Sequence, residues 1–215
     1  MSGQPFDLAA YAASCHVNAP EKLAVRAEAL RQHLVERNKV VNLTRITEKT
    51  AFDLKHAADS LSLGREFPKL TQLPLTVADL GCGGGFPALM LALAFPSWRI
   101  FAVDATAKKL AFVAAAAREL HLDNVTTIHA RIEELDKNPE YVGKFDLVTA
   151  RAVSSAPELY AKCGHLAKPA GWYIFYKTPT QAAEDLAGLS ADWQVTPPFE
   201  LPLDAGTRCF LWRQA

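Results

Sequence analysis

The residues best suited to chemistry lie in a glycine-rich run at 79–85. Asp79 is near the end of a short apolar stretch, and glycines then occupy positions 81, 83, 84 and 85. Glycine permits positive φ angles and lets a ligand approach the backbone closely. A helix is predicted to begin just beyond, and the free N–H groups of a helix start attract electron-rich groups. The run therefore predicts a ligand-binding loop that includes Gly81 and Gly83.

A second acidic residue, Asp104, ends the next predicted strand, 23 positions after Gly81. A carboxylate at this place is expected to accept hydrogen bonds from the ribose hydroxyls of an adenosine-type ligand. The spacing of Asp79 two residues before the first glycine differs from the dinucleotide fingerprint and matches loops that bind S-adenosylmethionine. A nicotinamide-dependent dehydrogenase and a doubly wound domain that has lost its ligand are the alternatives.

Two later segments contribute further candidates to the same site. Ile132 and Glu133 follow the third predicted strand, where an apolar side chain and a backbone N–H would meet an adenine ring. Glu133 taken alone would be a solvated carboxylate at a helix start. Arg151 ends the fourth predicted strand, at the edge where open α/β sheets hold their active sites. The alternative for Arg151 is a surface salt bridge.

An alternation of strands and helices would bring these residues together. Strands are predicted at 75–80, 98–104, 125–130, 145–149 and 172–177, with helices at 87–95, 107–120, 156–166 and 180–189. A final hairpin is predicted from 194–201 and 207–212, and three helices, at 5–15, 21–37 and 47–63, precede the first strand. This pattern predicts a Rossmann-like class I methyltransferase fold of the α/β class, with a seven-stranded, mostly parallel sheet, an antiparallel C-terminal hairpin and N-terminal helices. We expect one domain over 1–215, in which 1–70 is a helical extension and 71–215 is the core that binds S-adenosylmethionine.

Composition narrows the class of protein. The chain has 215 residues, 50% hydrophobic and 21% charged, and has no apolar run long enough to span a membrane. The N-terminus lacks the pattern of a secretion signal, so a cytoplasmic protein is expected. The four scattered cysteines form no CxxC pair, which favours buried free thiols over disulfides and predicts no metal site. The net charge is zero, although residues 21–65 hold nine Lys and Arg against six Asp and Glu.

Several further segments carry a family resemblance. The sequence contains Asn42-Leu43-Thr44, His56-Ala57-Ala58-Asp59-Ser60-Leu61, the glycine run to Phe86-Pro87, Lys108-Lys109-Leu110, Ala130-Arg131-Ile132-Glu133 and Ala150-Arg151-Ala152. In this order they resemble the bacterial RsmG/GidB family, whose members methylate N7 of a guanine in 16S ribosomal RNA. The resemblance extends from about residue 36 to residue 177.

The resemblance implies contacts to S-adenosylmethionine at Gly81, Phe86, Ile132, Glu133 and Arg151. It also implies a partner, 16S rRNA in the small ribosomal subunit. Guanine N7 has a lone pair and no proton, so the reaction needs no general base, and Arg151 is expected to position the base.

Substrate contacts are expected from polar residues near the predicted site: Asn42, His56, Asp59, Ser60 and Lys177. His56 and Asp59 could equally tie the N-terminal helices to the core, and Lys177 could contact phosphate or extend toward solvent. A monomer is expected. The alternative functions are a methyltransferase for a small molecule or protein, and a non-catalytic ribosome-assembly factor that binds S-adenosylmethionine.

Overall fold

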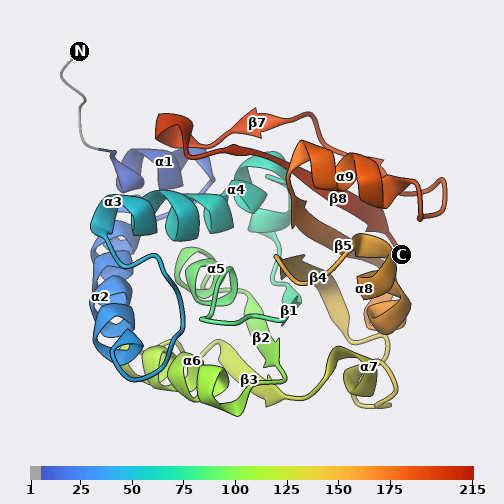
Figure 1. The fold of residues 1–215 in the computed structure, drawn as a ribbon, viewed down its shortest axis with the longest axis horizontal. Coiled ribbons are helices and arrows are strands. Elements are labelled where there is room, and N and C mark those ends of the chain that lie inside the picture. The colour runs from blue at the N-terminus through green and yellow to red at the C-terminus, as the bar shows by residue number, and fades with distance from the viewer. Residues whose placement is uncertain (1–5) are drawn as a thin grey trace.

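The computed structural model describes residues 6–215 and shows a central β-sheet with helices on both faces (Figure 1). Within those residues the sheet has eight strands in the order β3-β2-β1-β4-β5-β8-β6, and β7 pairs with β8. The strands are β1 Thr76–Leu80, β2 Arg99–Asp104, β3 Val125–His129, β4 Phe145–Arg151, β5 Ala167–Lys177, β6 Gln194–Val195, β7 Phe199–Glu200 and β8 Thr207–Gln214. Strands β1 to β5 run parallel, and β8 runs antiparallel to β5. The predicted fold class is confirmed.

The helices form two layers around this sheet. They are α1 Leu8–Ser14, α2 Pro20–Asn38, α3 Lys49–Phe52, α4 Asp59–Glu66, α5 Ala88–Ala94, α6 Ala107–Glu119, α7 Ile132–Leu135, α8 Ala156–Cys163 and α9 Pro179–Leu186, with a π-helical segment η1 Asp53–Ala58 and 3-10 turns η2 Leu70–Gln72 and η3 Pro202–Asp204. Figure 1 shows α2, α5 and α6 on one side of the sheet and α7 and α8 on the other. Alternate strand residues point to opposite layers, so Val77 packs into one core cluster and Ala78 into the other.

The predicted C-terminal hairpin was wrong in detail. The segment before β8 forms two short strands, β6 and β7, instead of one continuous strand, and both pair with β8. Pro197 and Pro198 lie between them, and proline lacks the N–H that a strand interior needs. This break is why the sheet has eight strands where seven were expected.

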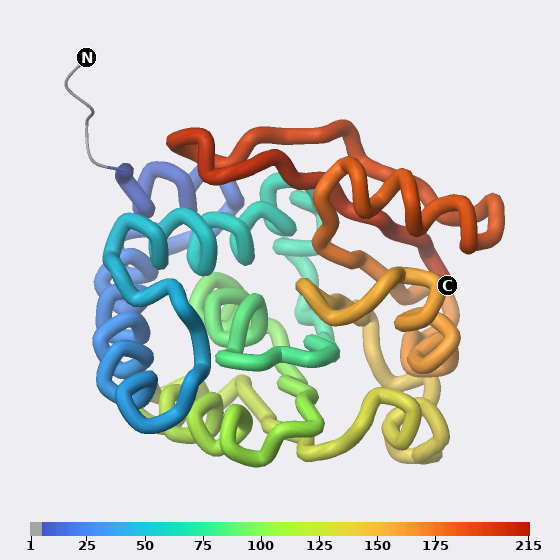
Figure 2. Tube along the Cα trace, in the orientation of Figure 1, coloured from blue at the N-terminus to red at the C-terminus, as the bar shows by residue number. Residues whose placement is uncertain are grey.

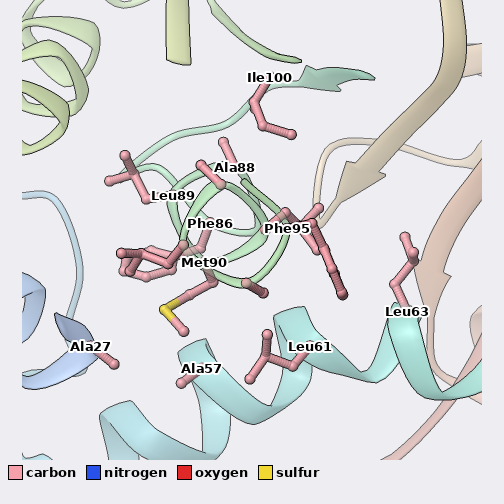
Figure 3. Close-up of a cluster of buried hydrophobic side chains, with 14 of the residues drawn as sticks. Ala27, Ala57, Leu61, Leu63, Phe86, Ala88, Leu89, Met90, Phe95 and Ile100 are labelled. Carbon is pink, nitrogen blue, oxygen red and sulfur yellow. The ribbon is translucent and has the colours of Figure 1, made fainter. Parts of the chain in front are cut away.

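The N-terminal helices share their core with the sheet. In α2 the buried residues are Leu23, Ala27, Leu30 and Leu34, whose helical spacing puts them on one face. All seven residues of α5 are buried, because α5 lies between the sheet and the helices α2 and α4. Figure 3 shows Met90 and Leu89 of α5 among side chains that include Ala27 and Leu61.

One expected helix, at 47–63, is present as three consecutive helical segments: α3, η1 and α4. The middle segment is π-helical, a widened geometry that is rare and often found at functional sites. In Figure 2 the connection between α2 and α3 loops toward the glycine-rich run, and the Leu43 carbonyl oxygen lies 3.6 Å from where a Cβ on Gly84 would be. The N-terminal part of the chain therefore forms one wall of the sheet edge described below.

All four cysteines are buried and unpaired, as expected. Among the residues described, no helix is both long and apolar enough to cross a membrane.

Candidate active site at the carboxyl edge of the sheet

The glycine loop leaves the end of β1 in a conformation that disfavours other residues. Gly81 has φ +67°, and a Cβ there would lie 2.7 Å from a methyl carbon of Val153. Gly85 has φ +87°, and a Cβ there would lie 2.5 Å from Leu89 in α5. Left-handed backbone and close approach both require glycine at these positions. The loop backbone therefore packs directly against Val153 and Leu89, and no side chain at Gly81 or Gly85 blocks the approach of a ligand.

Asp104 supports this loop from the end of β2. Its Oδ2 accepts a hydrogen bond from the Gly83 N–H at 2.9 Å, and its Oδ1 accepts one from the Thr106 N–H at 2.7 Å. A carboxylate has about four lone-pair sites. Asp104 can thus brace the loop and still accept hydrogen bonds from a ligand.

Asp79 is fully buried beneath the same loop. Its Oδ2 accepts a hydrogen bond from the Ala88 N–H at 3.0 Å at the start of α5, while its Oδ1 has no partner among the described residues. Burial raises the pKa of Asp79 to about 7, although the Ala88 N–H and Arg151 oppose the shift. The carboxyl group therefore changes charge near neutral pH.

Three adjoining cavities lie at this edge, where the strand order reverses between β1 and β4. The first cavity is about 260 Å³ and is lined by residues that follow β1 to β4. Its lining includes Gly81, Asp104, Ile132, Glu133, Val153, Ser154 and Lys162. Four of the residues predicted to bind the cofactor thus surround one cavity.

The second and third cavities continue from the first. The second, about 220 Å³, is lined by residues that include Leu43, Thr44, His56, Gly81, Gly83, Phe86, Lys109, Arg151 and Ala152. The third, about 350 Å³, is lined by residues that include Lys55, His56, Asp59, Arg151, Ala152, Lys177, Gln181 and Arg208. Gly81 connects the first to the second, and His56, Arg151 and Ala152 connect the second to the third.

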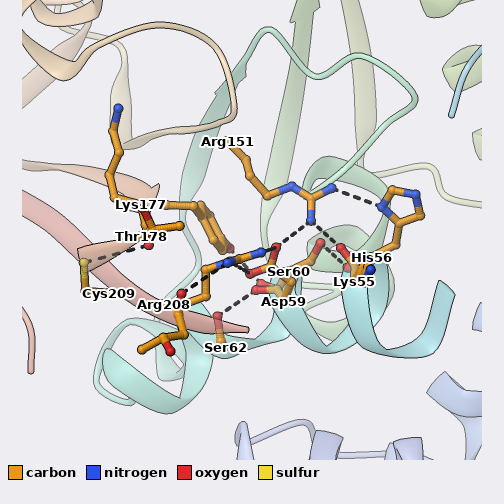
Figure 4. Close-up of polar contacts among 12 residues, drawn as sticks. Lys55, His56, Asp59, Ser60, Ser62, Arg151, Lys177, Thr178, Arg208 and Cys209 are labelled. Carbon is orange, nitrogen blue, oxygen red and sulfur yellow. Dashed lines mark hydrogen bonds and ion pairs between the residues drawn. The ribbon is translucent and has the colours of Figure 1, made fainter. Parts of the chain in front are cut away.

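Arg151 is the centre of a polar network between the last two cavities (Figure 4). Its Nη1 donates to the Lys55 carbonyl oxygen at 2.9 Å and to Asp59 Oδ2 at 3.0 Å, and its Nη2 contacts His56 Nδ1 at 3.2 Å. The Asp59 carboxylate also accepts from Arg208 Nε at 3.0 Å. Asp59 is buried, so the alternative of a purely surface salt bridge does not describe Arg151.

The contacts of His56 define its tautomer. A guanidinium only donates, so Nδ1 must accept the hydrogen bond from Arg151. The proton then lies on Nε2, which donates to Thr44 Oγ1 at 3.1 Å. Burial, with Arg151 nearby, lowers the pKa of His56 to about 3. The neutral ring stacks on Phe86 with centroids 4.2 Å apart.

Only some of the predicted substrate-binding residues line the cavities. His56, Asp59 and Lys177 line the third cavity. Ser60 does not line it: the side chain is fully buried and its hydroxyl donates to the His56 carbonyl oxygen at 2.6 Å, so a substrate contact of Ser60 stays a prediction. Asn42 is exposed in the connection before α3 and lines none of the three cavities.

Sequence reasoning missed several lining residues, including Lys55, Lys109, Val153 and Arg208. Val153 follows Arg151 closely, so the rule that loops after parallel strands build the site could have found it. Arg208 lies 149 residues from its partner Asp59, and no local signal marks it. Within residues 6–215, no group of three or more His, Cys, Asp or Glu side chains is arranged to hold a metal ion.

Solved structures share this architecture. A SAM dependent methyltransferase from Aquifex aeolicus superposes with a TM-score of 0.51 at 17% identity, covering 66% of this chain and 82% of that one. TrmN from Thermus thermophilus gives a TM-score of 0.56 at 16% identity, covering 73% of this chain and 49% of that one. At such identities the likeness shows the fold alone, which is the Rossmann-like α/β fold of class I methyltransferases.

Sequence relatives identify the family. The model of the GidB family, described as rRNA small subunit methyltransferase G, matches residues 24–203. A protein named ribosomal RNA small subunit methyltransferase G from Lactobacillus johnsonii is 43% identical over 154 residues, which cover 72% of this chain and 64% of that relative. A protein of the same name from Lysinibacillus sphaericus is 33% identical over 200 residues, which cover 89% and 82%. The chain belongs to the GidB family, and the resemblance noted from the sequence motifs is confirmed.

Proposed function

We propose that this protein is an S-adenosylmethionine-dependent methyltransferase that methylates N7 of a guanine in the 16S rRNA of the small ribosomal subunit. The observation that carries the proposal is the convergence of Gly81, Asp104, Ile132 and Glu133 on one cavity that opens, through Gly81, toward Arg151. Membership of the GidB family supports the substrate. A ribosomal substrate implies a cytoplasmic location, and we propose a monomer of one domain.

The residues of the first cavity suit an adenosine-type cofactor. The lone pairs of Asp104 that remain after it binds Gly83 and Thr106 would accept from ribose hydroxyls. Ile132 would pack on the adenine, beside Glu133. Gly81 keeps the passage to the second cavity open, since a Cβ at this position would contact Val153. When bound, S-adenosylmethionine supplies an electrophilic methyl group.

The second cavity offers positioning and no general base. His56 cannot accept a proton while Arg151 occupies its Nδ1 lone pair, and burial disfavours its charged form. Three of the five N–H groups of Arg151 are committed to Lys55, Asp59 and His56, so Nε–H and one Nη2 N–H remain for a base. These donors can orient a guanine through O6. Such a site suits a nucleophile that carries no proton, as N7 does.

A tritium-transfer assay tests this function. The protein is incubated with methyl-labelled S-adenosylmethionine and, separately, with small subunits, free 16S RNA and a total metabolite extract. The proposal predicts label in ribosomal RNA. Label confined to metabolites or protein would indicate a different methyltransferase on the same fold, and cofactor binding without transfer to any acceptor would indicate a non-catalytic assembly factor.

A further inference from the structure

The third cavity has a strong excess of positive charge. Four cations line it: Lys55, Arg151, Lys177 and Arg208. They face two carboxylates, Asp59 in the lining and Asp185, which pairs with Lys177 at 2.7 Å. His56 contributes no charge near neutral pH. Two positive charges thus remain in excess in a protein whose net charge is zero.

Arg208 is only partly committed to its neighbours. Its Nε donates to Asp59 Oδ1 at 3.0 Å and its Nη1 donates to the Thr207 carbonyl oxygen at 3.2 Å, while Nη2 lies 3.5 Å from Asp59 Oδ2. A guanidinium has five N–H donors, so at least two are available. Asp59 therefore orients the Arg208 guanidinium and leaves some of its N–H donors available to a ligand.

Lys55 adds a cation with no partner of its own. It is exposed on η1, and among the described residues its ammonium group makes no hydrogen bond or ion pair. Its backbone oxygen, in contrast, is tied to Arg151. Lys177 differs from Lys55 and Arg208, because its ammonium group is already bound by the Asp185 carboxylate and the Ser154 carbonyl oxygen. In Figure 4 the Lys177 side chain extends away from the arginines.

We propose that the third cavity binds a phosphodiester group of the RNA strand that carries the target base, through Lys55 and Arg208. This inference rests on the proposed function, because it takes the second cavity as the place of the base. The two cavities meet at His56, Arg151 and Ala152, so a base in the second places its own or a neighbouring phosphate at the third. Arginine and lysine together are the side chains that neutralise phosphate in RNA and DNA complexes.

Binding of a 16S RNA fragment, measured by filter retention at several salt concentrations, tests the role of Lys55 independently of turnover. Lys55→Gln should weaken binding about threefold or more at low salt, and should reduce the slope of log Kd against log salt by about 0.7–0.9, the value for one phosphate contact. Lys22→Gln is the matched control, because Lys22 is an exposed lysine on α2 that lines none of the three cavities. It should change neither quantity. Equal behaviour of the two variants would overturn the phosphate site.

Arg208→Lys tests whether the planar guanidinium of Arg208 binds the phosphodiester group. It keeps a positive charge beside Asp59 but loses the paired N–H groups. We expect RNA affinity to fall about fivefold or more, with unchanged calorimetric affinity for S-adenosylmethionine, since Arg208 does not line the first cavity. Wild-type RNA affinity in this variant would contradict the proposal.

The two proposals can fail separately. Methyl transfer by the wild-type protein, together with a Lys55→Gln variant that binds RNA like the control, would remove the phosphate site and leave the reaction standing. A loss of RNA affinity in Lys55→Gln, in a protein that transfers no methyl group, would leave the phosphate site standing and remove the reaction.

Discussion

Gly81 joins the first cavity to the second, and its lack of a side chain is what keeps them joined. Gly81→Ala should place a methyl group 2.7 Å from Val153 and strain the backbone at φ +67°. We expect the calorimetric affinity for S-adenosylmethionine to fall about tenfold or more, a loss of about 1.4 kcal/mol.

The control for Gly81→Ala is Gly143→Ala. Gly143 has φ +61°, but a Cβ there would meet nothing within 4 Å. Both variants should lose about 1 kcal/mol of stability from strain, and only Gly81→Ala should lose the ligand. Similar affinities in the two variants would show that the close approach at Gly81 does not shape the site.

The raised pKa of Asp79 predicts an unusual dependence of the free energy of unfolding on pH. Its folded-state pKa, about 7, is above the ordinary value of 3.8, so the folded protein holds this proton more tightly than the unfolded chain does. Its contribution to stability is present below pH 3.8 and is lost as the pH rises through 7. Asp79→Asn removes the charge. The free energy of unfolding of the variant relative to wild type should therefore rise by about 2–3 kcal/mol between pH 5 and pH 8.

Urea unfolding of both proteins at the two pH values measures this change. His56 contributes in the opposite direction, because its folded-state pKa of about 3 makes stability rise with pH up to about 6.5. His56 is present in both proteins, so its contribution cancels in the difference. A difference that does not change with pH would mean that Asp79 is not buried in its ionised form.

Sequence reasoning was most successful for residues that follow parallel strands. Gly81, Asp104, Ile132 and Glu133 come at the ends of three consecutive strands, and parallel strands bring such positions to one edge. It could not place Lys55, Thr44 or Arg208, because their positions depend on packing between elements far apart in the chain. Ser60 shows the converse: a polar residue in a motif donates its hydroxyl to the backbone of its own helical run, away from the cavities.

At the scale of elements, Arg151 links the end of β4 to the helical run formed by η1 and α4. It contacts the Lys55 carbonyl oxygen, His56 and Asp59 there, and Asp59 also holds Arg208 of β8. A lysine at position 151 would keep the charge but could not make these contacts together. The helical run of η1 and α4 would therefore have fewer hydrogen bonds to the end of β4.

Arg151→Lys should lower kcat/KM on small subunits by about tenfold or more. From the sequence alone, a cleft arginine would leave the melting temperature nearly unchanged. The buried pair with Asp59 leads us to expect a loss of about 1–3 kcal/mol of stability instead. Arg213→Lys is the control, since Arg213 pairs with Asp192 away from all three cavities. Wild-type turnover by Arg151→Lys would remove this residue from the site.

Elements were predictable where local pattern and packing agree. The apolar face of α2 and the strands β1 to β4 follow from periodicity and burial. The division of 49–66 into α3, η1 and α4 has no sequence signature, because a π-helical segment depends on what the widened turn packs against. The interruption between β6 and β7 does have a sequence signature, the pair Pro197 and Pro198, because proline lacks the N–H that a strand interior needs.

At the scale of the whole molecule, local charge matters more than total charge. The chain is neutral overall, yet one cavity beside the proposed reaction centre carries two positive charges in excess. The four cations of this cavity come from η1, β4, β5 and β8, and acidic residues elsewhere in the chain balance their charge. Zero net charge therefore does not argue against an RNA substrate.

The position of the transferred methyl group tests the central claim most directly. Small subunits from cells that lack this enzyme are incubated with the protein and S-adenosylmethionine, and the 16S rRNA is digested to nucleosides for mass spectrometry. The account predicts 7-methylguanosine, because the second cavity, where we place the target base, offers donors that orient the base and no free general base for a nucleophile that carries a proton. A methyl group on a ribose hydroxyl or an exocyclic amine would contradict it.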